Sequence, residues 1–289
     1  MRPAPAPVPF DAGGSDRHRG GTCPRPPGSA RFFTPQTGGD RSLAIASAPV
    51  PAEPSLIAVA RHPHLAVPRR AGWVRVDLHS HTMWSGDSTT TPDELHEAIG
   101  ASAIDVLCIT DHNAIAGAQR LAGELPCRVV VGEELRTHAG EIIGLFLTER
   151  VPFGVPPDEA ARIIRDQGGI VYIPHPFDPM RRNLAATALD ALVGDGLVDA
   201  LEVRNAKTSL EHLNAEAASY CATHALVPGA GSDAHVPDAI GAAYVEMPDF
   251  VDGDAASFLA SLRQGVIVGH HFDAPRPWRA RVIPSTAAG

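Results

Sequence analysis

From Trp73 onward, short runs of β-branched and apolar residues alternate with helix-like stretches, and this alternation restricts the possible fold more than any other feature. Repeated strand–helix units imply a mostly parallel sheet. About seven of them favour a barrel over an open doubly wound sheet, which shares the same local pattern. The expected strands cover residues 74–79, 104–110, 128–132, 141–147, 169–174, 198–204, 226–231 and 240–247. The expected helices begin at Pro92 and cover 114–124, 156–167, 184–193, 209–224 and 254–264.

The first 70 residues differ in composition from the rest of the chain and are rich in Pro, Gly, Ala and Arg. At the start of this segment, prolines alternate with other residues. Such a segment cannot bury enough apolar surface to build a core. We therefore expect a disordered extension over residues 1–70, a folded domain over 71–275 and a C-terminal tail over 276–289.

Charge and composition exclude several classes of protein. The formal net charge is -9, and no cluster of Lys and Arg is interleaved with aromatic residues, which disfavours binding to extended duplex nucleic acid. The four cysteines are scattered without a C-x-x-C pair, so neither a zinc ribbon nor a disulfide framework is expected. No apolar stretch approaches the roughly 20 residues of a membrane span. We expect a soluble, cytoplasmic protein, and its oligomeric state stays open.

Histidine and acidic residues recur where the predicted strands end. The C-terminal ends of the strands in a parallel barrel converge on one face, so these side chains should meet in one pocket. The residues are His79 and His81 after the first strand, Asp111 and His112 after the second, Glu133 and Glu134 after the third, His175 after the fifth, and Asp233 and His235 after the seventh.

The chemistry of these side chains points to bound metal. Imidazole nitrogens and carboxylates are ligands that borderline divalent cations accept, and a carboxylate can bridge two ions. His79 and His81 lie two positions apart in an extended segment, so both side chains point to the same face and can hold one ion together. A single such motif is weak evidence, whereas five in order at strand ends favour a cluster of cations.

The order of these motifs resembles the PHP superfamily, named for polymerase and histidinol phosphatase. The resemblance spans about residues 73 to 247 and rests on a specific set of segments. These are Asp77-Leu78-His79-Ser80-His81-Thr82 with Ser85, Asp87 and Pro92 following, then Thr110-Asp111-His112-Asn113, Gly132-Glu133-Glu134, His175-Pro176 and Gly231-Ser232-Asp233-Ala234-His235.

The resemblance implies a distorted barrel of about seven strand–helix units that carries roughly two or three divalent ions, drawn from manganese, iron and zinc. By similarity, one ion would be held by His79, His81, Glu134 and Asp233, and Glu134 would bridge to a second ion held by His175. A third ion would be held by Asp87, His112 and His235. These eight residues are also the predicted catalytic set.

Glu141 departs from the family pattern, in which many members have a histidine at this position. Its carboxylate could coordinate the second ion with an altered metal preference, or it could be solvated and leave the ion weakly held. Nearby His138 could substitute, although a loop role suits it better. Glu133 should point away from the cluster into a salt bridge or solvent, while Asp77 and Asp111 should orient ligand imidazoles.

A divalent cation lowers the pKa of bound water, so water rather than a side chain should be the nucleophile at phosphorus. The sequence predicts a metal-dependent phosphoesterase that hydrolyses a phosphomonoester or nucleotide phosphate through a metal-bound hydroxide. The alternatives are a 5′-3′ exonuclease or oligonucleotide phosphoesterase, and a catalytically degenerate metal-binding regulatory domain. Phosphate recognition suits planar guanidinium groups and other donors near the strand ends. The candidate substrate-binding residues are Arg181, Arg182, Arg204, Asn205 and Lys207.

Overall fold

The computed structural model describes residues 53–276, which fold into a mixed α/β barrel around a nine-stranded sheet. The strands are β1 (Trp73–Ser80), β2 (Val106–Ile109), β3 (Arg128–Thr137), β4 (Gly140–Leu145), β5 (Ile170–Ile173), β6 (Ala200–Asn205), β7 (Val227–Gly231), β8 (Ala243–Pro248) and β9 (Val266–Gly269). The α-helices are α1 (Leu56–Arg61), α2 (Pro92–Ser102), α3 (Ala116–Leu121), α4 (Pro157–Asp166), α5 (Ala186–Gly194), α6 (Glu211–Thr223) and α7 (Ala255–Leu262). Two 3-10 turns, η1 (Pro63–Ala66) and η2 (Pro237–Ala239), complete the described elements. The predicted barrel is confirmed.

The sheet follows the order β7-β6-β5-β4-β3-β2-β1-β8-β9 and nearly closes where the segment after β7 returns to β1. Closure comes from backbone hydrogen bonds at the end of β1. Asp233 N donates to His79 O at 2.8 Å, and His81 N donates to Ala234 O at 2.9 Å. The end of β7 therefore lies directly beside the His-x-His segment.

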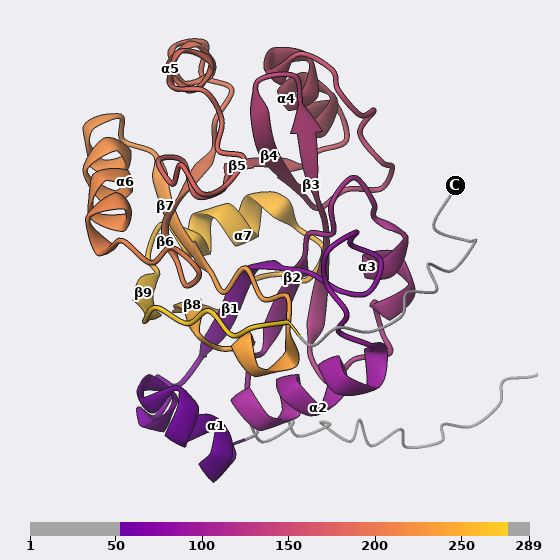
Figure 1. Ribbon diagram of the computed structural model, residues 1–289, viewed down its shortest axis with the longest axis vertical. Coiled ribbons are helices and arrows are strands. Elements are labelled where there is room, and N and C mark those ends of the chain that lie inside the picture. The colour runs from indigo at the N-terminus through magenta and orange to yellow at the C-terminus, as the bar shows by residue number, and fades with distance from the viewer. Residues whose placement is uncertain (1–52, 277–289) are drawn as a thin grey trace, which may run out of the picture. The chain divides into compact units, whose positions relative to one another are not determined.

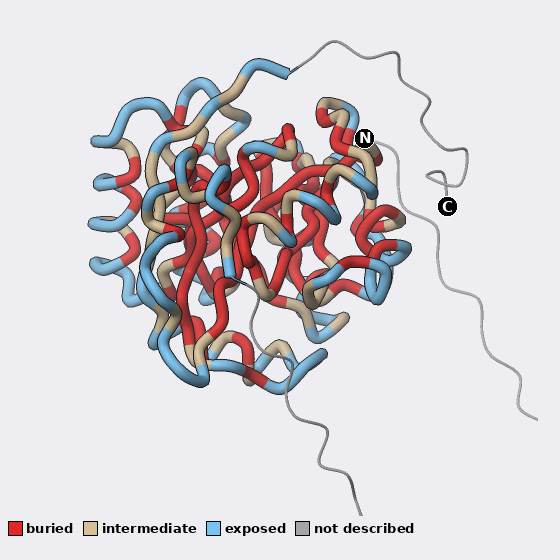
Figure 2. The backbone as a smooth tube through the Cα atoms, turned by 90° about the horizontal axis from the view of Figure 1, so that it is seen from below, coloured by how far each residue is buried: buried red, intermediate tan, exposed pale blue. Residues whose placement is uncertain are grey.

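Apolar side chains form layers on both sides of the sheet, and the strands are the most deeply buried part of the chain (Figure 2). The inner layer includes Val76, Cys108 and Tyr172 from the strands and Phe258 and Leu262 from α7. In Figure 1 this helix lies within the ring of strands, while α2 to α6 lie around it. The outer faces pack against those helices in two further clusters.

The sheet is less parallel than the sequence indicated. The pairs β1–β2, β2–β3, β5–β6 and β6–β7 are parallel, whereas β1–β8, β3–β4, β4–β5 and β8–β9 are antiparallel. The reason is that β3 runs on to Thr137 and turns back directly into β4, with no helix between them. This hairpin produces much of the barrel's distortion, and the short strand β9 was not expected.

Local sequence signals place several helix boundaries. At the start of α2, Thr91 accepts a hydrogen bond from Glu94 N, and the Glu94 side chain accepts one from Thr91 N. This reciprocal capping satisfies two backbone donors that a helix start leaves free, and Pro92 lacks one of them altogether. The predicted start at Pro92 is confirmed for this physical reason.

Residues 53–70, which the sequence placed in a disordered extension, are folded in the structure. The prediction of disorder is therefore wrong for these residues. Helix α1 and turn η1 pack Ala58 and Leu65 into the outer cluster beside α2. The Arg75 guanidinium, buried in β1, donates to the carbonyl oxygens of Leu65 and Val67 and fixes this segment further. Composition did not reveal these long-range contacts.

The remaining terminal expectations lie outside the described residues: disorder over 1–52 and a tail over 277–289. Within residues 53–276, none of the helices combines the length and the hydrophobicity needed to cross a membrane.

Candidate metal centre

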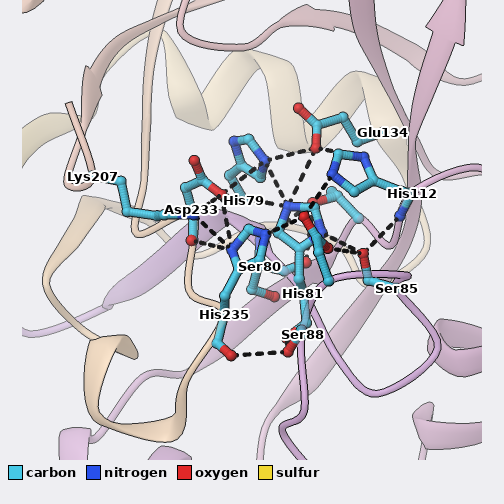
Figure 3. Close-up of polar contacts among 12 residues, drawn as sticks. His79, Ser80, His81, Ser85, Ser88, His112, Glu134, Lys207, Asp233 and His235 are labelled. Carbon is cyan, nitrogen blue, oxygen red and sulfur yellow. Dashed lines mark hydrogen bonds and ion pairs between the residues drawn. The ribbon is translucent and has the colours of Figure 1, made fainter. Parts of the chain in front are cut away.

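The nine predicted ligand side chains lie together at the carboxyl ends of β1, β2, β5 and β7 and on the β3–β4 hairpin. Figure 3 shows His79, His81, His112 and Glu134 turned toward one another, with Asp233 and His235 beside them. They form four groups. Within each group, every residue offers one potential ligand atom, and these atoms lie within 4.8 Å of one another. The groups are His81, Asp87, His112 and His235; His79, His175 and Asp233; His79, His81 and Glu134; and His112, Glu134 and Glu141.

The two histidines of the first motif face each other at the centre of the cluster. Their Nε2 atoms are 3.1 Å apart, and Glu134 Oε2 lies 3.4 Å from His79 Nε2 and 3.3 Å from His81 Nε2. Asp233 Oδ1 lies 3.8 Å and 3.5 Å from the same nitrogens. Both nitrogens therefore lie near carboxylate oxygens of Glu134 and Asp233, but Asp233 falls in a group with His79 and His175, whereas Glu134 falls in a group with His79 and His81.

Glu134 divides its two carboxylate oxygens between neighbouring groups. Its Oε1 lies 3.0 Å from His175 Nε2, while its Oε2 faces His79, His81 and His112, the last at 3.2 Å from Nδ1. A carboxylate in this position can bridge two ions and reduce the repulsion between them.

The third group gathers around Asp87, in the loop after β1. Asp87 Oδ2 lies 3.0 Å from His235 Nε2 and 3.3 Å from His112 Nε2. The rings of His81 and His235 are 4.2 Å apart between centroids, so His81 joins this group as well as the central one.

Charge distribution within the cluster follows from burial and proximity. Burial raises the pKa of Glu134, but the neighbouring His79 and His112 outweigh it and hold that pKa well below its usual range. Burial lowers the pKa of His79, yet Glu134 and Glu202 raise it well above its usual value. Burial and the neighbouring His235 lower the pKa of His81 to about 3. Because an imidazole binds metal only through an unprotonated nitrogen, metal binding here is linked to proton release.

The donor set suits divalent cations. Imidazoles lie among carboxylates, the ligand types that zinc, manganese and iron accept. Nδ1 of His175 is buried and lacks a hydrogen-bond partner among the described residues, and Nδ1 of His112 makes no hydrogen bond there although Glu134 Oε2 lies 3.2 Å away. A bound ion would also relieve the close approach of the two Nε2 atoms in the first motif.

Glu141 lies in the cluster and is 3% exposed, so it is not solvated. Its Oε1 accepts a hydrogen bond from Arg136 Nε at 3.1 Å and lies 3.8 Å from His112 Nδ1. Its Oε2 is 4.0 Å from His175 Nε2. The carboxylate therefore faces the cluster but is shared with a guanidinium group. His138 lies in the exposed turn of the hairpin.

A pocket of about 150 Å³ opens over the cluster, and three arginines line it. Two of them, Arg181 and Arg182, were predicted to contact substrate. The third, Arg136, was missed because it lies on β3, which continues beyond the predicted strand end. Met180 also lines this pocket and is 82% exposed.

Two of the predicted substrate residues have other partners. Arg204 Nη1 donates to Glu211 Oε2 at 3.0 Å, so its guanidinium is paired away from the pocket. Asn205 is buried and donates from Nδ2 to Glu202 Oε2 at 3.0 Å and to Asp233 Oδ2 at 3.3 Å. It therefore supports the cluster rather than facing substrate.

Three acidic residues near the cluster also differ from expectation. Glu133 points away from it but is buried, accepts from Val151 N at 2.9 Å and has its pKa raised to about 7 by burial. Asp77 accepts from the backbone N–H groups of His79 and Ser232, and Asp111 accepts from Thr82 N and Oγ1. Both carboxylates thus fix backbone and loop geometry rather than imidazole rings.

Glu202, in β6, was not identified from the sequence although it contacts three parts of the site. It is 1% exposed, its Oε1 lies 3.2 Å from His79 Nδ1, and its Oε2 accepts from His175 N at 2.8 Å and from Asn205. His175 has a left-handed φ of 29°, which a non-glycine residue adopts only when its surroundings hold it. An acidic residue inside a buried apolar strand was the available signal.

Comparison with known proteins gives matches over both halves of the folded part. Residues 77–146 match the family described as PHP domain, and residues 211–267 match the family described as PHP-associated. An uncharacterized protein of Methanocaldococcus jannaschii is 38% identical over 146 residues, which are 46% of this chain and 82% of that protein. A second uncharacterized protein of the same organism is 34% identical over 178 residues, 61% of this chain and 71% of the other.

Among solved structures, similarity extends to a two-domain protein from Bacteroides vulgatus that contains a predicted PHP-like metal-dependent phosphoesterase. The TM-score is 0.54 at 19% sequence identity, with 71% of this chain and 67% of that chain covered. At this level of identity the similarity shows a shared fold.

Proposed function

This chain belongs to the PHP family, and from this premise we propose that it is a metal-dependent phosphoesterase acting on a phosphomonoester or nucleotide phosphate. One observation carries the proposal. Side chains from five strand regions converge in four overlapping ligand groups, directly beneath a pocket lined by arginines. A site that only held a structural ion would not need three arginines around its opening.

The ligand groups fit two or three divalent ions of the manganese, iron and zinc type. His79, His81, Glu134 and Asp233 would hold one ion, His175 and Glu141 would extend the site to a second, and Asp87, His112 and His235 would hold a third. Bound divalent ions activate water by lowering its pKa and neutralise charge on a phosphoryl group.

The chain's own residues supply recognition of the phosphate. Arg136 from β3 and Arg181 and Arg182 from the segment after β5 line the pocket, and guanidinium groups match phosphate oxygens with paired donors. Arg181 Nε is buried, makes no hydrogen bond within the described chain and lies 3.8 Å from Asp233 Oδ2, so a phosphate oxygen could accept a hydrogen bond from it. The pocket is small, about 150 Å³, which favours a compact phosphoryl group at the ions.

The proposal is tested by assaying the manganese-loaded protein against a panel of phosphate monoesters and nucleotides. Short 5′-phosphorylated oligonucleotides in the same panel test the exonuclease alternative. We expect turnover of monoesters that chelation abolishes and manganese restores. A degenerate regulatory domain would hydrolyse neither class, and full activity after chelation would exclude the proposed chemistry.

Variants at the cluster give a matched comparison. His79→Ala should lower turnover by about 100-fold or more, because several kcal/mol of charge stabilisation depend on the metal centre. His96→Ala, at an exposed position on α2, should leave turnover unchanged. Circular dichroism of both variants checks that the fold is retained, and unimpaired hydrolysis by His79→Ala would remove it from the ligand set.

A further inference from the structure

Residues 270–276 follow β9 and reach the metal centre, and we call them the C-terminal strap. In Figure 1 the strap is the yellow segment that leaves β9. The backbone N–H groups of His270 and Phe272 donate to barrel carbonyl oxygens at 3.0 Å and 2.8 Å. The His270 ring also contacts His62, with 2.8 Å between His270 Nε2 and His62 Nδ1. The first half of the strap is therefore anchored by several contacts.

The far end of the strap contacts Asp87, a predicted ligand of the third ion. The Arg276 guanidinium donates to the backbone oxygen of Asp87, and its Nη1 lies 3.9 Å from the carboxylate Oδ2. The same carboxylate oxygen lies 3.0 Å from His235 Nε2 and 3.3 Å from His112 Nε2. The guanidinium group and a third ion would therefore share one carboxylate oxygen.

Asp87 is the candidate ligand that is most accessible to such a contact. Its side chain is 36% exposed, whereas none of the other eight exceeds 12%. A cavity of about 110 Å³ is lined by Asp273 and Arg276 of the strap and by Lys207 and His235 of the barrel. Because strap and barrel are not closely packed at this point, Arg276 can move away from Asp87 without disturbing the core.

Arg276 can act on an ion at Asp87 in two opposite ways. Its hydrogen bond to the backbone of Asp87 holds the loop after β1, which favours ion binding. Its positive charge repels a divalent ion and attracts the same carboxylate oxygen, which opposes ion binding. One hydrogen bond on an exposed loop contributes little, whereas repulsion between a unit charge and a divalent ion a few ångström apart changes an affinity by about 10-fold even in water. The repulsion is therefore the larger effect.

We propose that the strap is an autoinhibitory element, in which Arg276 competes with the third ion for Asp87. The third ion then binds tightly only when the end of the strap has moved aside. This rests on the metal centre of the proposed function. Within the described residues, no hydrogen bond or ion pair joins the strap to His79 or Glu134, so the first ion should bind independently of the strap.

The test is calorimetric titration of the chelator-treated, full-length protein with manganese. Asp87→Asn identifies the third ion, because this variant should weaken only the binding step that uses its carboxylate. We expect Arg276→Gln to strengthen that step by about 10-fold and to leave the other steps unchanged. The two groups are partly exposed, so the difference between wild type and Arg276→Gln should shrink as the salt concentration rises.

Two further variants separate this contact from a general effect of charge. Arg263→Gln removes one positive charge at an exposed position after α7 and should leave every manganese step as in wild type. In the Asp87→Asn background, Arg276→Gln should change no step, because the shared carboxylate is absent. Circular dichroism confirms the fold of each variant.

Four outcomes would overturn the proposal. Identical titrations of wild type and Asp87→Asn would show that this carboxylate holds no ion. An unchanged third step in Arg276→Gln would show that there is no competition, and a weaker one would show that Arg276 organises the Asp87 loop. Equal strengthening by Arg263→Gln would reduce the effect to net charge. Because the readout is binding, a protein that bound manganese as described but hydrolysed no ester would refute the proposed function and leave this inference standing.

Discussion

Glu202 illustrates how much of the metal centre depends on a single side chain that does not face the pocket. Its two oxygens contact the ring of His79, the backbone N–H of His175 and the amide of Asn205, which in turn contacts Asp233. These contacts reach every member of one ligand group, His79, His175 and Asp233. Carboxylates of this kind fix the orientation and basicity of a ligand imidazole.

We therefore expect Glu202→Gln to weaken manganese binding by about 10- to 100-fold, the range typical of partners behind a ligand histidine. The NH₂ group of the introduced glutamine would face an N–H donor from which the Glu202 carboxylate accepts a hydrogen bond. Calorimetric titration of chelator-treated protein measures the effect. Glu211→Gln, at an exposed residue paired with Arg204, is the control, and equal affinities in both variants would mean that Glu202 has no positioning role.

At the scale of elements, closure of the barrel depends on how closely β7 approaches β1. A Cβ atom at Gly231 would lie 2.3 Å from the Cβ of His79 and 2.8 Å from its backbone nitrogen. Real side chains do not tolerate such contacts, so only glycine allows the strand end to sit against the His-x-His segment. The same approach brings Asp233 and His235 into the cluster.

Gly231→Ala should consequently destabilise the protein by about 1–3 kcal/mol, as overpacking of a dense core does, and also lower metal affinity. Gly100→Ala provides the contrast, because this exposed position in α2 has open space around it and alanine favours helix by about 0.5–1 kcal/mol. Urea unfolding of both variants measures the difference. Similar stability changes in the two variants would contradict the closure argument.

At the scale of the whole molecule, the two ends of the described chain meet in a cluster of three histidines, His62, His64 and His270. His62 Nδ1 lies 2.8 Å from His270 Nε2, and His62 Nε2 lies 2.9 Å from Asp238 O. Burial, with smaller contributions from His270, His64 and Arg61, lowers the pKa of His62 to about 4, and burial also lowers the pKa of His64 and His270.

This cluster should make stability depend on pH. In the unfolded chain a histidine titrates near 6.5, so between about 6.5 and 4 the unfolded state binds protons that folded His62 does not. Stability from this source is complete above pH 6.5 and is lost as the pH falls toward 4. Thermal unfolding of wild type and His62→Phe across this range should show a smaller pH dependence in the variant. His96→Gln should retain the wild-type dependence.

Truncation tests the described part of the N-terminal segment. Removal of residues 1–70 should lower the melting temperature more than removal of residues 1–52, because only the longer deletion takes away Leu65 and the carbonyl acceptors of Arg75. Loss of those acceptors leaves a buried guanidinium short of partners, which is costly. Equal melting temperatures would show that the segment contributes no stability.

Local pattern determined the order of strands and helices and the residues at each strand end. Period-two alternation, helix caps and the His-x-His motif act over a few neighbouring residues, so the start of α2 and the gathering of His79 with His81 could be derived without a structure. The same local view failed at the β3–β4 hairpin, where the strand runs past its predicted end. It also failed at residues 53–70, whose composition resembles that of a disordered chain.

Only the tertiary structure decided which residues far apart in the sequence contact one another. The contact of Glu202 with His79 and the contact of Arg276 with Asp87 both depend on strand register and on the path of loops. Sequence alone supplied the ligand types and their order because side-chain chemistry is local. Packing of the whole barrel determines which ligand side chains lie close together. The local sequence pattern allows several partners for each side chain, and the long-range contacts select one of them.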